Sequence, residues 1–295
     1  MSNYDDLLNN VPAGEQANGQ LSKEEYAAKK QAEREAIYEL SDNAALEVSG
    51  DSKQFQQYLD IQSKFDRYSA VNTLLILAQN PEATRLGSFD YWKSQNGSIK
   101  SGETGISILE PGREYERDDG SIGVSYNIKK VFDISQVDTR KLKLTPTPNY
   151  TERQILGALI SKYPMRIIGV DELSGDRGAM TNSNGDILVR KGMEFSDTFR
   201  SVAYEMAGAE LATDTELSPV QEFSAYSATY LLCKKYGADT QNFSFEDAPG
   251  VFNDMDAQEV KGELSQIRDA FENISGRMSR QLEAQAKAAK SQEAR

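Results

Sequence analysis

The 295 residues include no histidine, and Cys233 is the only cysteine. An intrachain disulfide, a cysteine-cluster metal site and a two-histidine zinc site are therefore excluded, and the fold must rest on apolar burial. The same counts exclude serine–histidine and cysteine–histidine hydrolases and imidazole acid–base chemistry. With 38% apolar residues, the chain can bury two modest cores, which fits its length at about 150 residues per domain.

The formal net charge is −13, which disfavours binding of a polyanion by the molecule as a whole. The negative charge lies in residues 1–50 and 151–295, whereas residues 51–150 are neutral, so a local basic face is expected only in the middle of the chain. No apolar run is long enough to cross a membrane, and the acidic start lacks a signal-peptide pattern. We expect a cytoplasmic protein without a cofactor.

The first part of the chain has mainly helical patterns. Residues 1–20 are polar and are typical of a disordered tail. Ser22 and Glu25 have the spacing of a capping box, which predicts a polar helix from there to about Glu47. Apolar residues at helical spacing predict two further helices, over residues 55–62 and 69–79.

The pattern changes between residues 97 and 132, where short apolar alternations lie between glycine-containing turns. Arg117–Gly120 is a hairpin-turn signal, so this region is expected to form a small sheet. The proline-rich segment 145–149 is a linker, and we place a domain boundary there.

The second half mixes strands and helices. Strands are expected near residues 165–170 and 186–190, with the turn 181–185 between them. Helices are expected over the ranges 151–162, 196–211 (capped by Ser196 or Asp197) and 218–236 (ended by Gly237).

The C-terminal segment has a narrow apolar stripe with steps of three and four residues, which predicts an amphipathic helix. The helix is followed by a solvated polar tail that starts near residue 284. The stripe allows self-association through this helix, and its members are Val260, Leu264, Ile267, Phe271, Ile274, Met278 and Leu282.

Three polar residues stand in the otherwise apolar helix 69–79: Ser69, Asn72 and Gln79. Buried polar groups need partners, which are either local backbone or a ligand. Ser69 also suits a helix cap, and Trp92 suits a core position as well as a platform for a base. The glycine turn Lys100–Gly105 either approaches a phosphate or simply reverses the chain.

Aromatic residues and cations lie close together here, a combination that suits single-stranded nucleic acid, because bases stack on rings and phosphates meet cations. The aromatic residues are Phe89, Tyr91 and Trp92, and the cations are Arg85, Lys93, Lys100, Lys129 and Lys130.

Several separate motifs lie between residues 68 and 136. They are Tyr68-Ser69, Asn72, Gln79, Pro81, Ala83-Thr84, Phe89, Trp92, Gly97, Ile99-Lys100, Gly102-Glu103, Gly105-Ile106 and Val131-Phe132-Asp133-Ile134-Ser135-Gln136. This stretch resembles the N-terminal single-stranded-DNA-binding domain of ArdC-type antirestriction proteins, also found in LtrC-like proteins. Ser101 and Thr104 stand where the family usually has lysine, which predicts weaker and less salt-sensitive DNA binding.

The resemblance and the neighbouring cations together predict a DNA-binding set of Tyr68, Ser69, Asn72, Gln79, Arg85, Trp92, Lys93, Lys100, Gly102, Lys129 and Lys130. It also implies an α+β fold with a small helical and sheet-containing domain over residues 21–144. A zincin-like α+β domain over residues 150–255 and the C-terminal amphipathic helix with its polar tail over 256–295 would follow.

Full family members carry a metallopeptidase-like helix with a His-Glu-x-x-His motif, in which two histidines four residues apart bind one metal. Here Tyr204, Glu205 and Gly208 occupy the corresponding positions, so both histidines are absent. Ser224 and Tyr226 stand where the next helix of the family has glutamates. The resemblance therefore implies a zincin-like domain that binds no metal.

Three hypotheses follow. The first is a non-enzymatic single-stranded-DNA-binding accessory protein of a conjugative plasmid or other mobile element, active in antirestriction or protection of transferred DNA, with host or conjugation proteins as further partners. The second is an acidic module that binds a host DNA-binding or defence protein. The third is a metallopeptidase with unorthodox carboxylate ligands from Glu205, Glu210 and Glu222.

Overall fold

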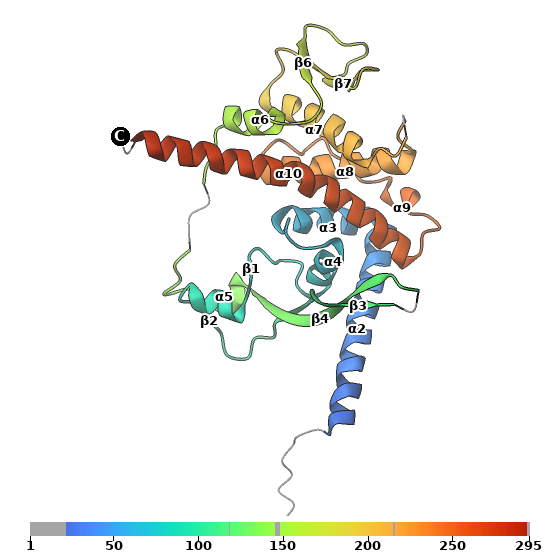
Figure 1. Cartoon of the computed structure of the whole chain (residues 1–295), viewed down its shortest axis with the longest axis vertical. Helices are drawn as coiled ribbons and strands as arrows, with labels where there is room; N and C mark the ends of the chain where they lie inside the picture. The colour runs from blue at the N-terminus through green and yellow to red at the C-terminus, as the bar shows by residue number, and fades with distance from the viewer. Residues whose placement is uncertain (1–21, 118, 145–147, 215, 294–295) are drawn as a thin grey trace, which may run out of the picture. The chain divides into compact units, whose positions relative to one another are not determined.

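The computed structural model describes residues 22–117, 119–144, 148–214 and 216–293, with side chains to residue 288 (Figure 1). The expected mixture of helices and small sheets is confirmed. The chain divides into two compact units, Met1–Tyr38 and Glu39–Arg295. The expected disordered tail, residues 1–20, lies outside the described residues.

The first described helix, α2, spans Lys23–Gly50, and its start is the predicted capping box. The backbone N–H of Glu25 donates to Ser22 Oγ at 3.1 Å, and the Ser22 N–H donates to the Glu25 carboxylate at 2.8 Å. Two of the orphan donors at the helix start are thereby satisfied.

Two short helices follow, α3 (Ser52–Lys64) and α4 (Ala70–Gln79). Asp51 caps α3 by accepting the backbone N–H groups of the first turn. Helix α4 is buried over most of its circumference, as its wide apolar run predicts.

The next segment forms an antiparallel sheet in the order β1–β4–β3. Gly120, at φ +79°, lies in the predicted turn between β3 and β4, and a bulge interrupts the hairpin between Pro111 and Glu114. The bounds in this segment are β1 Leu86–Ser88, α5 Phe89–Ser94, β2 Ser98–Ile99, β3 Ile106–Glu116, β4 Ile122–Asp133, the 3-10 turn η1 Ile134–Gln136 and β5 Val137–Asp138.

The second half contains a three-stranded sheet in the order β6–β8–β7, where β6 runs parallel and β7 antiparallel to the central β8. The bounds are α6 Glu152–Ile160, β6 Ile167–Val170, β7 Ala179–Thr181, β8 Ile187–Arg190, α7 Phe195–Leu211, α8 Pro219–Tyr236 and α9 Ala248–Val251. Helix α8 ends at Gly237 with φ +75°, as predicted.

The start of α7 differs from the prediction. Its N-cap position is Glu194, and both Ser196 and Asp197 lie within the first turn. The Ser196 hydroxyl accepts a hydrogen bond from the backbone N–H of Asp239 instead of capping its own helix.

The last helix, α10, spans Ala257–Glu293, so the segment predicted as a polar tail is helical as far as the structure describes it. Every member of its apolar stripe, from Val260 to Leu282, is at most 2% exposed and belongs to the core. The stripe is covered by the chain itself, which corrects the expectation that it is available for self-association.

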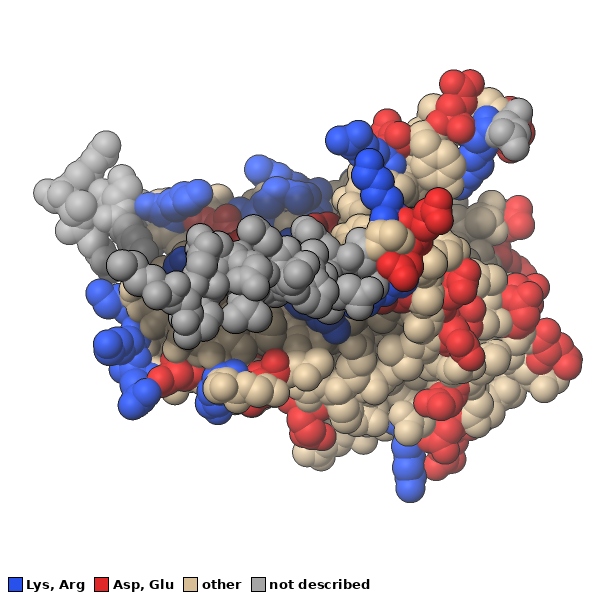
Figure 2. Space-filling model, turned by 90° about the horizontal axis from the view of Figure 1, so that it is seen from below, with Lys and Arg blue, Asp and Glu red and all other residues tan. Residues whose placement is uncertain are grey.

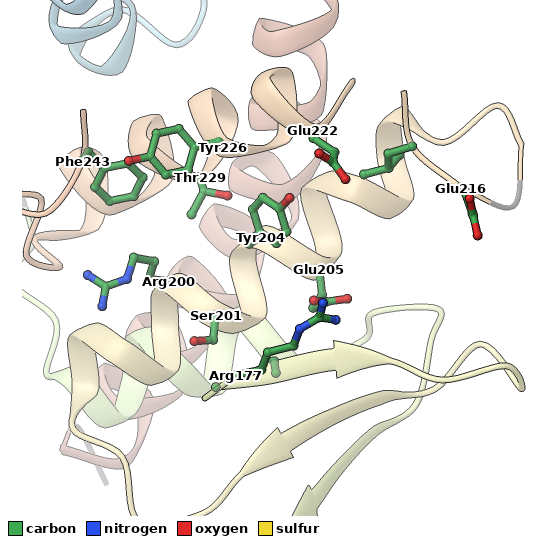
Figure 3. Close-up of a pocket in the computed structure, with 13 residues that line it drawn as sticks. Arg177, Arg200, Ser201, Tyr204, Glu205, Glu216, Glu222, Tyr226, Thr229 and Phe243 are labelled. Carbon is green, nitrogen blue, oxygen red and sulfur yellow. The ribbon is translucent and has the colours of Figure 1, made fainter. Parts of the chain in front are cut away.

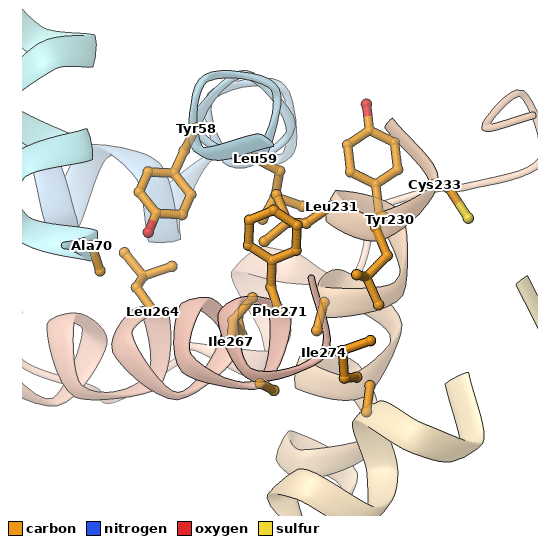
Figure 4. Packing of buried hydrophobic residues seen from close by; sticks show 14 of the residues in the cluster. Tyr58, Leu59, Ala70, Tyr230, Leu231, Cys233, Leu264, Ile267, Phe271 and Ile274 are labelled. Carbon is orange, nitrogen blue, oxygen red and sulfur yellow. The ribbon is translucent and has the colours of Figure 1, made fainter. Parts of the chain in front are cut away.

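Apolar residues from both sides of segment 145–149 pack in one cluster instead of two separate cores. Figure 4 shows Tyr58 and Leu59 of α3 beside Leu264 and Phe271 of α10, with Leu231 of α8 next to them. Helices α8 and α10 therefore support the first half of the chain as well as their own. The domain boundary at the linker stays a prediction.

Among the described helices, none is long and apolar enough to cross a membrane.

Candidate functional site

Two amide side chains of α4 close the outer edge of strand β3. The amide of Asn72 donates to the backbone carbonyl of Leu109 and accepts its N–H, both at 2.8 Å. Gln79 makes the same pair of bonds with Ser107, at 2.9 and 2.8 Å. The edge strand thus has its backbone groups satisfied as if another strand lay beside it. Local backbone, one of the two partners expected for these residues, is the one that the structure shows.

Ser69 is the N-cap of α4, because its hydroxyl accepts the backbone N–H of Asn72 at 3.2 Å. The neighbouring Tyr68 is half-buried, and burial raises the pKa of its hydroxyl. Tyr68 precedes the helix, and its ring packs edge-on against Phe65 while part of its surface stays open to solvent.

Trp92 is fully buried, and its indole N–H donates to the carbonyl of Phe132 at 2.9 Å. A side chain at Gly87 would come within 3.0 Å of the indole and 2.2 Å of the Tyr91 ring, so glycine at this position permits the close packing. The prediction that Trp92 binds DNA is corrected: the ring is part of the core, because α5 lies against β1 and β4.

Three of the predicted cations are engaged within the fold. Lys129 forms an ion pair with Glu110, and Lys130 donates to the Gly105 carbonyl and the Ser107 hydroxyl. Lys100 donates to the Ser135 carbonyl at 2.6 Å.

The remaining members of the predicted set are open to solvent to different degrees. Lys93 is exposed and Arg85 is half-buried, and neither side chain has a hydrogen bond to another described residue. Gly102 has φ +85°, which a glycine adopts without strain, so it serves the turn that Lys100 begins. Ser101 and Thr104, where the family usually has lysine, are exposed.

The Asp133 side chain joins two segments of this domain by hydrogen bonds. Its carboxylate accepts the backbone N–H groups of Thr84, Arg85 and Ser135 at 2.7 to 2.9 Å. Burial acts to raise the pKa of this carboxyl, but these donors outweigh it and hold the pKa below the ordinary value. The aspartate of the Val-Phe-Asp-Ile-Ser-Gln motif therefore has a structural role.

A groove of about 350 Å³ lies on this domain, and we call it the sheet groove. Its wall combines two aromatic rings, two cations, one carboxylate and a proline: Tyr68, Tyr91, Arg67, Lys129, Glu110 and Pro111. Sequence reasoning placed Tyr68 and Lys129 in the site, named Tyr91 only as a nearby aromatic residue, and missed Arg67. Their signal was proximity, because each is adjacent in sequence to a residue of the predicted set.

A larger cavity, of about 740 Å³, lies between α7, α8 and β7, and we call it the α7–α8 cavity (Figure 3). Tyr204 and Glu205 of the degenerate motif line it, together with Glu222 and Tyr226 of α8 and Phe243 beyond it. Of the three positions that the resemblance assigned to a metal motif, Tyr204 and Glu205 therefore line the cavity, whereas Gly208 does not.

Glu205 is held by strand β7. Its carboxylate accepts both the backbone N–H and the hydroxyl of Thr181, at 2.8 and 2.7 Å. Burial, with a smaller contribution from Glu222 and Glu205, raises the pKa of Tyr204. Arg177, which lines the same cavity, acts in the opposite direction and lowers this pKa.

The neighbouring side chains make contacts within the protein. The Tyr226 ring packs against the Phe243 ring in a tilted arrangement, with centroids 4.8 Å apart, and its hydroxyl accepts the backbone N–H of Ser244. Ser224 is buried, and Gly208 places its backbone close to Leu217.

The donor set does not fit a metal ion. Of the three carboxylates considered as unorthodox ligands, Glu205 and Glu222 line the cavity, whereas Glu210 lies outside it and accepts from Asn273. Within the described residues, no group of three or more histidine, cysteine, aspartate or glutamate side chains is placed to hold a metal.

Residues 30–145 match the family model described as the N-terminal domain of anti-restriction factor ArdC. The metal-free crystal structure of the antirestriction protein ArdC from plasmid R388 is similar at 15% identity and a TM-score of 0.46, covering 72% of this chain and 86% of that one. The Mn(II)-bound structure of that protein is similar at 14% identity and the same TM-score, with 72% and 85% covered. Among curated proteins, none matches the chain.

Residues 30–145 therefore form an ArdC-like N-terminal domain, which confirms the resemblance that the motifs of this stretch indicated.

Proposed function

We propose that the protein is a non-enzymatic accessory protein of a mobile element that binds single-stranded DNA and acts in antirestriction or in protecting transferred DNA. Support comes from the ArdC N-terminal domain at residues 30–145, which contains the sheet groove. The carrying observation is that this groove places the rings of Tyr68 and Tyr91 beside Arg67 and Lys129.

The groove has the chemistry that a single strand needs. Tyrosine rings accept stacked bases regardless of sequence, and arginine and lysine neutralise phosphates. Lys129 is paired with Glu110 across the groove, so a phosphate must compete with that carboxylate for the ammonium group. The exposed ring of Phe89, at the start of α5, extends the aromatic surface.

The distribution of charge fits this location. On the face seen in Figure 2, lysine and arginine are more frequent on the left and aspartate and glutamate on the right; in Figure 1 the left side carries α5 and β2 together with the C-terminal end of α10. A strand of DNA is attracted to the basic side and repelled from the acidic one.

The absence of catalysis in the second half is part of the proposal. Glu205, the residue that would activate water in the family motif, is engaged with Thr181, and Tyr204 and Gly208 replace the metal-binding histidines. Protein purified without chelator is expected to contain less than about a tenth of an equivalent of transition metal. A stoichiometric metal content, together with peptidase activity, would favour the third hypothesis.

DNA binding is tested by fluorescence anisotropy with a labelled oligothymidylate at low salt. Tyr91→Ala and Arg67→Ala are each expected to weaken binding about tenfold, because one stacked base or one phosphate contact is lost. Lys53→Ala, an exposed lysine of α3, is the matched control and should bind as the wild type does. Absence of binding at micromolar protein would refute the proposal.

A gain of affinity provides the complementary test. Ser101→Lys with Thr104→Lys restores the two lysines usual in the family at exposed positions of the glycine turn. The double variant should bind more tightly, and the slope of log affinity against log salt should steepen by about 1.4 for two added phosphate contacts. An unchanged slope would show that DNA does not pass this turn.

A further inference from the structure

The two edges of the β1–β4–β3 sheet are protected to different degrees. The outer edge of β3 is closed by the amides of Asn72 and Gln79. Charged side chains and proline keep an edge strand from pairing with another chain. Beyond the two amides, β3 carries such residues at exposed positions, namely Pro111, Arg113, Glu114 and Glu116.

The outer edge of β4 lacks this protection over residues 122–128, which we call the β4 edge. Strand β1 pairs with β4 only at Val131–Asp133, and no other described strand lies along this side of β4. The sequence of the β4 edge, Ile-Gly-Val-Ser-Tyr-Asn-Ile, contains neither a charge nor a proline. An uncharged segment of this length on an open edge is a template for pairing with a further strand.

Apolar side chains of the β4 edge are open to solvent. Ile122 is 61% exposed, Val124 38% and Tyr126 41%. Since side chains alternate between the two faces of a sheet, these residues form one row on the same face, which the half-buried Ile128 continues. A strand added at this edge would cover the row as well as the backbone.

The β4 edge is complementary to itself when two copies are paired in antiparallel orientation. If a twofold axis passes at Ser125, every apolar residue of the row faces an apolar residue of the second copy. Pairs of β-branched and aromatic side chains are among those that stabilise a sheet. The pairs formed in this register are Ile122 with Ile128 and Val124 with Tyr126.

The ends of the β4 edge are compatible with the same register. Lys129 lies diagonally across from Asp119 of the second copy, so opposite charges approach each other at both ends. The hairpin turn of the second copy also has room, because its Gly120 lies opposite Lys130, one residue before β1 begins to pair with β4.

We propose that the β4 edge binds a second copy of this chain, by antiparallel pairing of the two β4 strands into one continuous sheet. Each copy uses the same edge, so the assembly closes as a twofold dimer. No residue of the β4 edge lines the sheet groove, so the proposal does not depend on DNA binding.

Sedimentation equilibrium from low micromolar to several hundred micromolar protein tests self-association. The wild type should approach twice the mass of the chain. Val124→Lys places a charge in the apolar row and should weaken dimerisation by about tenfold or more. Ile168→Lys is the matched control, because Ile168 is 37% exposed and lies in strand β6, and it should dimerise as the wild type does. Circular dichroism verifies that both variants are folded.

Disulfide cross-linking tests the direction and register of the pairing. Ile122→Cys and Ile128→Cys are prepared separately and oxidised mildly, alone and as a mixture. Only the mixture should give a cross-linked dimer, because identical positions lie six residues apart along the strands, on the order of 20 Å. Cys233 should not compete, since burial raises the pKa of its thiol to about 12.

Three outcomes would overturn the proposal. A wild type that stays monomeric throughout the concentration range would leave the β4 edge to an extended segment of another protein. Equal dimerisation of Val124→Lys and Ile168→Lys would assign self-association to another surface. Cross-linking of Ile122→Cys alone would indicate parallel strands and contradict the twofold register.

Discussion

The polar side chains at the edge of β3 and some of those in the α7–α8 cavity differ in whether the fold supplies their hydrogen-bond partners. Asn72 and Gln79, two residues of the ArdC-like motif, have both the N–H and the oxygen of their side-chain amides hydrogen-bonded to backbone, so the fold itself uses these groups. In the degenerate part, Glu222 has no donor among the described residues. A residue of a recognised motif can therefore be fully used by the fold, whereas the exposed carboxylate of Glu222 is left to solvent.

The largest expected effect is on the buried tryptophan. Trp92→Ala should lower the free energy of unfolding by about 3–5 kcal/mol, because it leaves a cavity in the core and frees the Phe132 carbonyl. Denaturant unfolding measures it, and Tyr91→Ala at the neighbouring exposed position is the control. A stable Trp92→Ala protein that has lost only DNA affinity would restore the role as a base platform.

The second largest loss of stability is expected from removing one of the two amides that pair with β3. Asn72→Ala should cost about 2–4 kcal/mol, since it leaves the N–H and the carbonyl of Leu109 buried without partners. Gln54→Ala, on the exposed side of α3, should change stability by less than about 0.5 kcal/mol. Equal effects of the two substitutions in urea unfolding would contradict the structural role of Asn72.

A smaller effect is expected in the cavity. Glu205→Leu removes the acceptor of the Thr181 N–H and hydroxyl and should destabilise by about 1–2 kcal/mol. Glu222→Leu, whose carboxylate has no described donor to release, should be close to neutral in the same unfolding experiment. A large loss in Glu222→Leu would mean that this carboxylate also serves the fold.

The smallest effect concerns pH. The pKa of Asp133 is lower in the folded than in the unfolded state, so its contribution is complete above the unfolded pKa of about 3.9 and is lost as pH falls through the folded pKa. The stability difference between wild type and Asp133→Asn should therefore shrink below about pH 4. Asp90→Asn, at an exposed position, supplies the control, and a difference that is constant with pH would refute the assignment.

Much of the fold was predictable from local patterns. The capping box at Ser22, the turn at Gly120 and the stop at Gly237 depend on neighbours a few residues away, and all three are present. The start of α7 was misplaced because the Ser196 hydroxyl is used by Asp239, a residue 43 positions away.

The candidate sites were harder to predict. For each polar side chain the sequence allowed two partners, local backbone or a ligand, and nothing in the sequence distinguished them. Asn72 could meet backbone or DNA until β3 was placed beside α4. Trp92 and Tyr91 are adjacent in the sequence, yet one is buried and the other exposed. The α7–α8 cavity draws on residues from Arg177 to Phe243, and no local pattern joins them.

The sequence by itself determined the chemistry that is excluded and the family of the first domain, because the absence of histidine and the order of motifs are properties of the chain alone. Only the tertiary structure decided which polar side chains are hydrogen-bonded within the fold and which remain open to a ligand. The physical reason is that the sequence shows which side chains can donate or accept a hydrogen bond but not which partner each of them meets. Packing then either supplies a partner, as for Asn72, or leaves the group facing a cavity, as for Glu222.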